Sequence, residues 1–118
     1  MALTVYHYPA CSTCRRALKW LEEHAIPHAR VDIVQQPPSR AILERVLEHQ
    51  NGNLRALFNT SGQSYREGNF KERLPKLTRE QALAALAADG KLIKRPLLVD
   101  DWRSLVGFDE AAYRTALL

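Results

Sequence analysis

Two cysteines three residues apart are the first candidates for chemistry in this sequence. Cys11 and Cys14 form a Cys-Ser-Thr-Cys motif and are the only cysteines of the chain. A thiol attacks only as its thiolate, and an ordinary cysteine, with a pKa of about 8.5, is a few per cent ionised at neutral pH. A working site therefore needs surroundings that stabilise an anion at one of the two sulfurs.

Cys11 is predicted to lie where a strand ends and a helix begins. Free backbone N–H groups and the positive end of the helix dipole stabilise an anion at such a position. Arg15 and Arg16 follow in the first helical turn, and Arg95 joins them if the fold closes as predicted below. We therefore expect the pKa of Cys11 to lie well below its ordinary value.

Cys14 is expected to behave differently, because its spacing places it on the same helix face as Leu18 and Leu21. Burial on that face keeps a thiol neutral. An ionised first sulfur and a sheltered second one divide the roles of attacking and resolving cysteine, and their spacing suits a disulfide. The motif predicts a thiol–disulfide site with Cys11 as its nucleophile.

Other interpretations of the cysteine pair compete with a redox site. Haem attachment is excluded, because Arg15 and not a histidine follows the second cysteine. A second interpretation is that both cysteines are inert, small hydrophobic side chains. This interpretation suits Cys14 better than Cys11, which stands at a helix start. Structural zinc needs four ligands, and we expect no metal, because no repeated ligand spacing is found among the histidines His7, His24, His28 and His49.

The elements that position the motif follow from the pattern of the chain. Residues 3–8 alternate and are rich in β-branched and aromatic side chains, which predicts a strand. Ser12 and Thr13 can cap the helix that follows, and Pro27 ends it. A second strand over residues 29–34 completes a β-α-β unit.

The middle of the chain is predicted to be helical. One helix starts at Ser39, and a short helical piece over residues 54–58 precedes a loop at residues 59–62. Thr78 has the capping-box spacing to a glutamine three residues later, and Gly90 fits the end of that helix. These signals therefore predict a helical insertion over about residues 38–90.

A hairpin is predicted after Pro96, with strands over residues 97–99 and 103–106, followed by a last helix that Asp109 caps. The order β-α-β, helical insertion, β-β-α favours an α/β fold. We predict one thioredoxin-like domain over residues 1–118, with a mixed four-stranded sheet covered by helices and an inserted helical subdomain.

The pair Arg95-Pro96 opens the predicted hairpin and is a second site of interest. In thioredoxin-like folds the corresponding proline is cis and faces the cysteine motif, which would place Arg95 near an oxyanion held at Cys11. Alternatively, Pro96 simply begins a strand beside a solvated arginine. Sequence reasoning leaves both interpretations open.

The composition limits the classes of protein to consider. The 118 residues include 46% hydrophobic side chains and carry a formal net charge of +4, with no long basic run, so we expect no direct nucleic-acid partner. We find neither an apolar run of about 20 residues nor a secretory signal, which predicts no membrane association. A reducing, cytoplasmic compartment is expected, because two cysteines do not make a disulfide scaffold.

Four segments in register carry a family resemblance: residues 6–11 (YHYPAC), 54–60 (LRALFNT), 92–96 (LIKRP) and 106–108 (VGF). Together they resemble the arsenate reductase (ArsC) superfamily, which includes the Spx and MgsR regulators. The similarity runs over about residues 3–117. It implies a thioredoxin-like fold with a helical insertion, in agreement with the order of the predicted elements.

Glutathione- and glutaredoxin-coupled arsenate reductases of this family use the cysteine that matches Cys11 as nucleophile and hold the oxyanion with three arginines. Only Arg95 is kept here, while Asn59 and Gly107 stand at the other two positions. Those enzymes also usually lack a cysteine where this chain has Cys14. Because a charge-assisted hydrogen bond is worth about 1.5–3 kcal/mol, we expect weak or no arsenate reduction.

The resemblance implies a thiol-dependent oxidoreductase acting on a disulfide, a glutathione adduct or, less readily, arsenate. Its expected reductant is glutathione, a glutaredoxin or a thioredoxin, with no tightly bound cofactor. The expected catalytic residues are Cys11, Cys14 and Arg95. The expected substrate-binding residues are Ser12, Thr13, Arg15, Asn59 and Pro96.

The alternative is a redox-sensing transcriptional regulator without turnover. Spx-type members of the superfamily bind the C-terminal domain of the RNA polymerase α subunit and use the cysteine pair as a switch. The CxxC pair and Asn59 bring this sequence nearer to that branch. The resemblance therefore leaves an enzyme and a regulator as two hypotheses.

Overall fold

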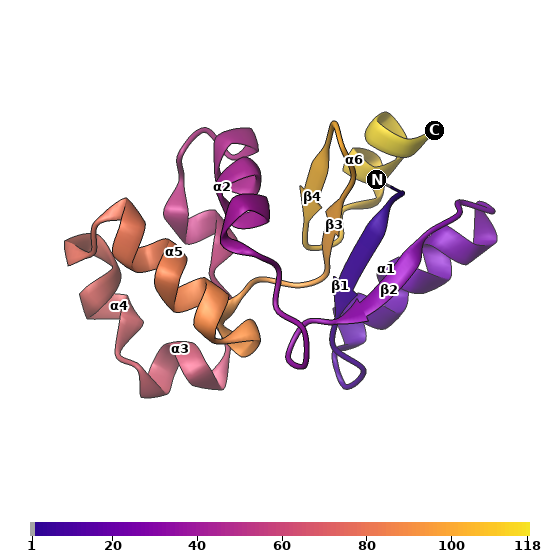
Figure 1. Ribbon diagram of the computed structural model, residues 1–118. Helices are drawn as coiled ribbons and strands as arrows, with labels where there is room; N and C mark the ends of the chain where they lie inside the picture. Colours follow the sequence, from indigo (N-terminus) through magenta and orange to yellow (C-terminus); the bar gives the residue numbers. More distant parts are fainter. Residues whose placement is uncertain (1) are drawn as a thin grey trace. The chain divides into compact units, whose positions relative to one another are not determined.

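The computed structural model describes residues 2–118, which form two compact units (Figure 1). The first unit combines the N-terminal part of the chain, up to Asp32, with Arg95–Leu118. The second unit is Ile33–Lys94 and holds the stretch predicted as a helical insertion. Both cysteines and the Arg95-Pro96 pair belong to the first unit.

The first unit contains a mixed four-stranded sheet, as predicted. Its strands are β1 (Thr4–His7), β2 (Ala29–Asp32), β3 (Leu97–Val99) and β4 (Ser104–Val106), and their order in the sheet is β2-β1-β3-β4. β1 runs parallel to β2 and antiparallel to β3, and β3 pairs antiparallel with β4. The two central strands therefore come from the two ends of the sequence.

The strands β1, β2 and β4 are each shorter than predicted, for reasons that lie in the adjoining turns. β1 ends at His7 because the carbonyl of Tyr8 accepts a hydrogen bond from the N–H of Cys11, 3.0 Å away, instead of joining the ladder. β4 begins only at Ser104, because the N–H of Arg103 donates to Asp100 in the hairpin turn. Turn chemistry ends the pairing in both places.

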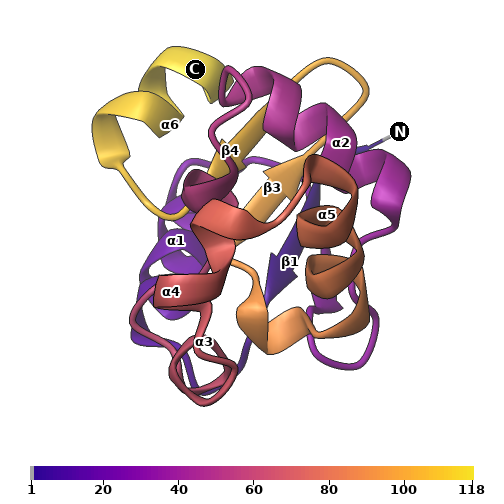
Figure 2. The ribbon, with the colours of Figure 1, turned by 90° about the vertical axis from the view of Figure 1, so that its left-hand side faces the viewer.

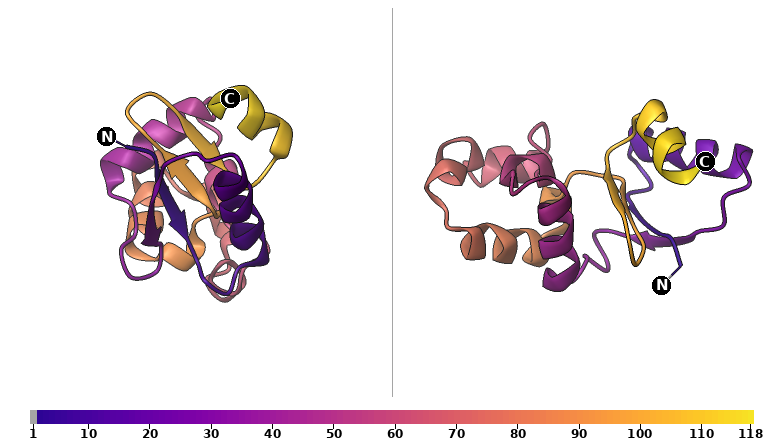
Figure 3. Two further views of the ribbon diagram at one scale, coloured as in Figure 1. Left: turned by 90° about the vertical axis from the view of Figure 1, so that its right-hand side faces the viewer. Right: turned by 90° about the horizontal axis from the view of Figure 1, so that it is seen from above.

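Two helices, α1 (Ser12–Glu23) and α6 (Glu110–Leu117), lie on the same side of the sheet (Figure 3). The two helices and the sheet share an apolar core, in which Tyr113 is 1% exposed. The Tyr113 hydroxyl donates a hydrogen bond to the Gly107 carbonyl at 2.7 Å. The buried members of this core are Val5, Ala17, Leu18, Trp20, Leu21, Leu98 and Tyr113.

The start of α1 corrects the predicted cap. Ser12 and Thr13 are the first two residues of the helix, and the N-cap is Cys11, whose sulfur accepts from the N–H of Cys14. The helix ends at Glu23, ahead of Pro27, and Ala25 turns the chain with φ 53°. The nucleophile predicted from the sequence is thus itself the capping group.

The second unit is built from helices. They are α2 (Arg40–His49), α3 (Gln63–Glu67), α4 (Phe70–Arg73) and α5 (Arg79–Ala88), with 3₁₀ turns over Leu54–Leu57, Leu74–Lys76 and Gly90–Leu92. Ser39 caps α2, and Thr78 with Gln81 forms the predicted capping box at the start of α5. α2 and α5 pack against each other (Figure 2).

The short helices α3 and α4 have no clear periodic pattern in the sequence, and they are held by aromatic packing. The rings of Phe58, Tyr65 and Phe70 lie 5.7–6.3 Å apart, centroid to centroid. Packing among these aromatic side chains, and not helix propensity, therefore fixes this part of the unit.

Gly90 has a different role from the predicted one. The helix α5 already ends at Ala88, and Asp89 caps the following 3₁₀ turn, which Gly90 begins. A Cβ atom at Gly90 would lie 1.8 Å from the carbonyl oxygen of Ile33. Only glycine allows the two backbone segments to approach this closely.

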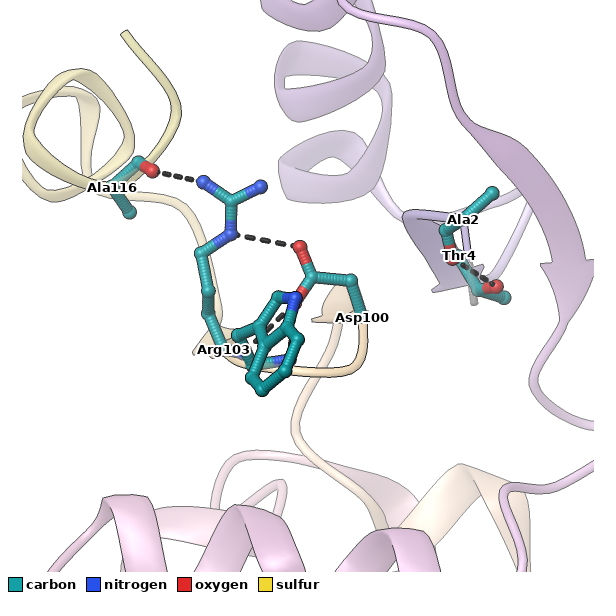
Figure 4. A network of polar contacts seen from close by, with 6 residues as sticks. Ala2, Thr4, Asp100, Arg103 and Ala116 are labelled. Carbon is teal, nitrogen blue, oxygen red and sulfur yellow. Dashed lines mark hydrogen bonds and ion pairs between the residues drawn. The ribbon is translucent and has the colours of Figure 1, made fainter.

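The hairpin between β3 and β4 is fixed by one carboxylate. Oδ1 of Asp100 accepts from the N–H groups of Trp102 and Arg103, and Oδ2 accepts from Nε of Arg103 at 2.8 Å. The Arg103 guanidinium also donates to the carbonyl of Ala116 near the end of α6 (Figure 4). The buried Asp100 therefore links the hairpin turn, through Arg103, to the last helix.

Candidate redox site

Cys11 stands in the loop that joins β1 to α1. Its backbone is extended, with φ −86° and ψ 116°, and its N–H donates to the Tyr8 carbonyl. The N–H of Cys14 donates to Sγ of Cys11 across 3.3 Å. Cys11 is half-buried, whereas Cys14 is 0% exposed, and the two sulfurs are free thiols.

Arg95 reaches the same site from the chain segment that leads into β3. The Arg95-Pro96 peptide bond is cis, and the Pro96 carbonyl accepts from the N–H of Gly107 at 2.8 Å. The side chain of Arg95 is half-buried and hydrogen-bonds Cys11. The structure therefore places Arg95 beside the first thiol, and its part in holding an oxyanion stays a prediction.

The electrostatic surroundings of Cys11 favour its thiolate. Partial burial opposes ionisation, but hydrogen bonds from the side chain and the backbone of Cys14, together with the hydrogen bond and the charge of Arg95, lower the pKa of Cys11. A thiolate that accepts several such bonds is stabilised relative to the thiol. The direction of the shift is the one expected from the sequence.

The pKa of Cys14 is shifted in the opposite direction, upward. Burial is the main cause and raises the pKa of Cys14 to about 12, while a hydrogen bond from the Tyr8 backbone acts against it. The hydrogen bond to Cys11 and the negative charge on that sulfur raise the pKa further. Cys14 thus stays protonated, and its S–H group donates a hydrogen bond to the Cys11 sulfur. Because the two sulfurs interact in this way, they titrate as a pair.

The remaining predicted substrate-binding residues lie in different surroundings. Ser12 and Arg15 are exposed, Thr13 is half-buried, and the Arg15 guanidinium donates to the Pro9 carbonyl at 3.1 Å. Pro96 is buried beside Arg95, whereas Asn59 belongs to the second unit, where its N–H donates to the Leu92 carbonyl. Their part in binding a substrate stays a prediction.

Arg16 was expected to add positive charge near Cys11, but its guanidinium is directed elsewhere. The central carbon of that group lies 5.8 Å from the centre of the Phe108 ring, over its face. The guanidinium that contributes to the lowered pKa of Cys11 is instead the one of Arg95. The guanidinium groups of Arg16 and Arg95 thus have different contact partners.

Tyr8 is a member of the site that sequence reasoning missed. The guanidinium carbon of Arg95 lies 4.9 Å from the centroid of its ring, which is a cation–π contact. The signal available in the sequence was an aromatic residue three positions before the first cysteine. That signal alone could not show which arginine would contact the ring.

Within residues 2–118, no group of three or more His, Cys, Asp or Glu side chains is arranged to hold a metal ion. Among the same residues, no helix is both long and apolar enough to cross a membrane.

A four-stranded mixed sheet, a CxxC pair at the start of α1 and a cis-proline directly after the arginine that interacts with Cys11 define a thioredoxin-like protein of the α/β class. The sequence profile of the ArsC family matches residues 6–116. The chain belongs to the ArsC family.

Curated relatives cover almost the whole chain. The uncharacterized protein YusI of Bacillus subtilis is 48% identical over 110 residues, which are 93% of each chain. The global transcriptional regulator Spx of Listeria innocua is 29% identical over 98% of this chain and 86% of its own. The regulatory protein MgsR of Bacillus subtilis is 28% identical over 91% and 83%, respectively.

Solved structures agree with the fold. An ArsC family related protein from Bacteroides fragilis superposes with a TM-score of 0.92 at 38% identity, over 98% of this chain and 97% of that one. A possible arsenate reductase from Streptococcus mutans gives a TM-score of 0.88 at 42% identity, over 96% of both chains. The predicted thioredoxin-like fold and the family resemblance are therefore confirmed.

Proposed function

We propose that this protein is a cytoplasmic thiol-dependent reductase that acts on disulfides or glutathione adducts. The proposal rests on one observation: Cys11 and Cys14 are in hydrogen-bond contact, and their surroundings move the two pKa values in opposite directions. Such a pair divides the roles of attacking and resolving thiol.

In the first step the Cys11 thiolate attacks one sulfur of a substrate disulfide. A new S–S bond forms between Cys11 and that sulfur, the substrate S–S bond breaks, and the second sulfur leaves as a thiolate. Arg95 and the N–H of Cys14 stabilise the Cys11 anion until it is consumed. This exchange needs no outside oxidant or reductant, because the protein and the substrate together keep the same number of electrons.

In the second step Cys14 resolves the mixed disulfide. Once Cys11 has no negative charge, the interaction with that charge no longer raises the pKa of Cys14, so its proton passes more readily to the departing thiolate. The Cys14 sulfur then attacks Cys11: the Cys11–Cys14 bond forms, the bond between Cys11 and the substrate breaks, and the remaining substrate sulfur leaves as a thiolate that takes a proton from solvent. The substrate has gained two electrons from the protein. Glutathione, a glutaredoxin or a thioredoxin then supplies two electrons that reduce the Cys11–Cys14 disulfide.

The test is reduction of a glutathionylated peptide, followed by mass spectrometry. The unmodified protein should release the free peptide and end as a Cys11–Cys14 disulfide. Cys14→Ser should accumulate a mixed disulfide at position 11, and Cys11→Ser should form none. Equal turnover by Cys11→Ser and the unmodified protein would remove the proposed mechanism.

Arsenate is a separate question of substrate. Only Arg95 remains of the three arginines that hold the oxyanion in the related arsenate reductases, so we expect arsenate to be reduced weakly or not at all. Steady NADPH consumption with arsenate, glutathione and a glutaredoxin, lost in Cys11→Ser, would contradict this expectation.

A second candidate function is a redox-switched regulator, and it is favoured by the similarity to Spx over 98% of the chain. On this alternative the oxidised and reduced cysteine pair would alter binding to the C-terminal domain of the RNA polymerase α subunit. A pull-down with that domain, with and without oxidant, separates the two candidates. No retention in either state would count against the regulator.

A further inference from the structure

Tyr8 contacts all three residues of the proposed redox site. Its carbonyl accepts from the N–H of Cys11 at 3.0 Å, and its backbone hydrogen-bonds Cys14. Its ring lies 4.9 Å from the guanidinium carbon of Arg95. The first two contacts belong to the backbone, so the cation–π contact is the one that depends on the identity of the side chain.

The ring limits the positions that the arginine can take. An arginine side chain has several rotatable bonds, and a hydrogen bond to a half-buried thiolate fixes only its tip. An aromatic face attracts the planar guanidinium and restricts its orientation. Because the Tyr8 ring contacts the guanidinium, it can favour the rotamer in which Arg95 reaches Cys11.

We propose that Tyr8 is a positioning residue, whose ring holds the Arg95 guanidinium beside the Cys11 sulfur and thereby sets how readily that sulfur attacks at neutral pH. This inference deepens the proposed function, because it rests on the use of Cys11 as a thiolate. Tyr8 touches no reacting atom with its ring and acts through Arg95.

Two other aromatic side chains of the unit, Trp20 and Tyr113, serve packing. Trp20 and Tyr113 belong to the apolar core between α1, α6 and the sheet, whereas Tyr8 is half-buried and outside that core. Replacing the Tyr8 side chain should therefore leave the core intact. It should also preserve the hydrogen bonds to Cys11 and Cys14 that the Tyr8 backbone makes.

The titration of Cys11 depends on few charged or titratable groups. Those that act on it are Cys14 and Arg95, and the charge of Cys14 acts in turn on Tyr113. Arg15 in the first turn of α1 donates to the Pro9 carbonyl, and Arg16 stacks on Phe108. A change at Tyr8 can therefore be followed through its effect on Arg95.

The experiment measures the rate of iodoacetamide alkylation at position 11 against pH, with mass spectrometry to identify the modified cysteine. Tyr8→Leu removes the ring and should raise the midpoint of the profile by about half a pH unit, which slows alkylation about threefold below the midpoint. The limiting rate at high pH should not change. Tyr8→Phe keeps the ring and should match the unmodified protein.

Two further variants make the test specific. Phe108→Leu removes the other cation–π ring of the unit, which contacts Arg16, and should leave the midpoint unchanged. A trifluorinated phenylalanine at position 8 keeps the shape of the ring but weakens its attraction for cations, so its midpoint should lie close to that of Tyr8→Leu. This variant preserves the test if Tyr8→Leu does not fold.

A double-mutant cycle with Arg95→Gln gives the decisive result. If Tyr8 acts through Arg95, then Tyr8→Leu should cause no further shift once the guanidinium is gone. An equal shift in both backgrounds, or an unchanged midpoint in Tyr8→Leu and in the fluorinated variant, would overturn the inference. A normal thiol pKa in the unmodified protein would instead overturn the proposed function, so the two failures can be told apart.

Discussion

The backbone N–H of Cys14 points at the sulfur of Cys11 across 3.3 Å. The second cysteine of the motif therefore stabilises the first one twice, once through its backbone and once through its thiol proton. Because Cys11 is also the N-cap of α1, the hydrogen bond that begins the helix is the same bond that stabilises the nucleophile.

Two substitutions of Cys14 separate the contribution of its thiol proton from that of its backbone. Cys14→Ala removes the side-chain donor and should raise the pKa of Cys11, while Cys14→Ser keeps an O–H donor and should raise it less. The expected difference is about 1 kcal/mol, or somewhat under one pH unit in the alkylation profile. Identical profiles for the two variants would show that the backbone bond alone matters.

Substitution of Arg95 should also shift this profile. Arg95→Gln removes the charge beside Cys11 and should raise its pKa by about one unit, since charge-assisted hydrogen bonds are worth about 1.5–3 kcal/mol and this group is partly solvated. Arg95→Lys keeps the charge but loses the planar group, and an intermediate profile is expected. If Arg95→Gln left the profile unchanged, Arg95 would have no electrostatic role at the thiol.

The raised pKa of Cys14 predicts how stability depends on pH. Its pKa of about 12 in the folded protein lies above the ordinary value of a thiol, so between about pH 9 and 12 the unfolded chain loses this proton while the folded protein keeps it. The contribution of Cys14 to stability is therefore fully present below pH 9 and decreases as the pH rises.

Denaturant unfolding of the unmodified protein and Cys14→Ala across this range measures that contribution. The free energy of unfolding should fall more steeply with pH in the unmodified protein, by up to about 1.4 kcal/mol per pH unit. Tyrosines titrate in both proteins, and the comparison removes the contribution of those that do not interact with Cys14, as Tyr113 does. Parallel curves would mean that Cys14 is not buried as a neutral thiol.

Two glycines of the second unit offer a matched test of backbone packing. Gly90→Ala places a Cβ atom against the Ile33 carbonyl and should destabilise the protein by about 3 kcal/mol or more. Gly52 has φ +77° but open space around it, so Gly52→Ala should cost only about 1 kcal/mol of backbone strain. Thermal unfolding compares them, and equal losses would contradict the close approach at Gly90.

The sequence was most informative where local chemistry decides the structure. Thr78 and Asp109 cap their helices as predicted, and Ser39, where a helix was predicted to start, is the N-cap of α2. An N-cap depends on residues that are close in sequence. The order of the four strands and of α1, α2, α5 and α6 also followed from periodicity and turn residues, whereas α3 and α4 had no clear periodic pattern. The opposite shifts of Cys11 and Cys14 were predicted on the same local grounds, from a helix start and a buried helix face.

Sequence reasoning failed where distant residues decide the structure. Gly90 was interpreted as a helix stop, because nothing nearby in sequence reveals the approach of Ile33. The contact between Tyr8 and Arg95 joins residues that are far apart along the chain, so no spacing rule could show it. For the same reason Arg16 was expected near Cys11, although its partner is the Phe108 ring.

The central claim is that Cys11 is a stabilised thiolate with a protonated Cys14 beside it, and the alkylation rate of each cysteine against pH tests it most directly. The profile of Cys11 should have its midpoint below the ordinary thiol pKa of about 8.5, while Cys14 stays unmodified until strongly alkaline pH. Two cysteines that react at equal rates, with a shared midpoint near or above that ordinary value, would contradict the claim.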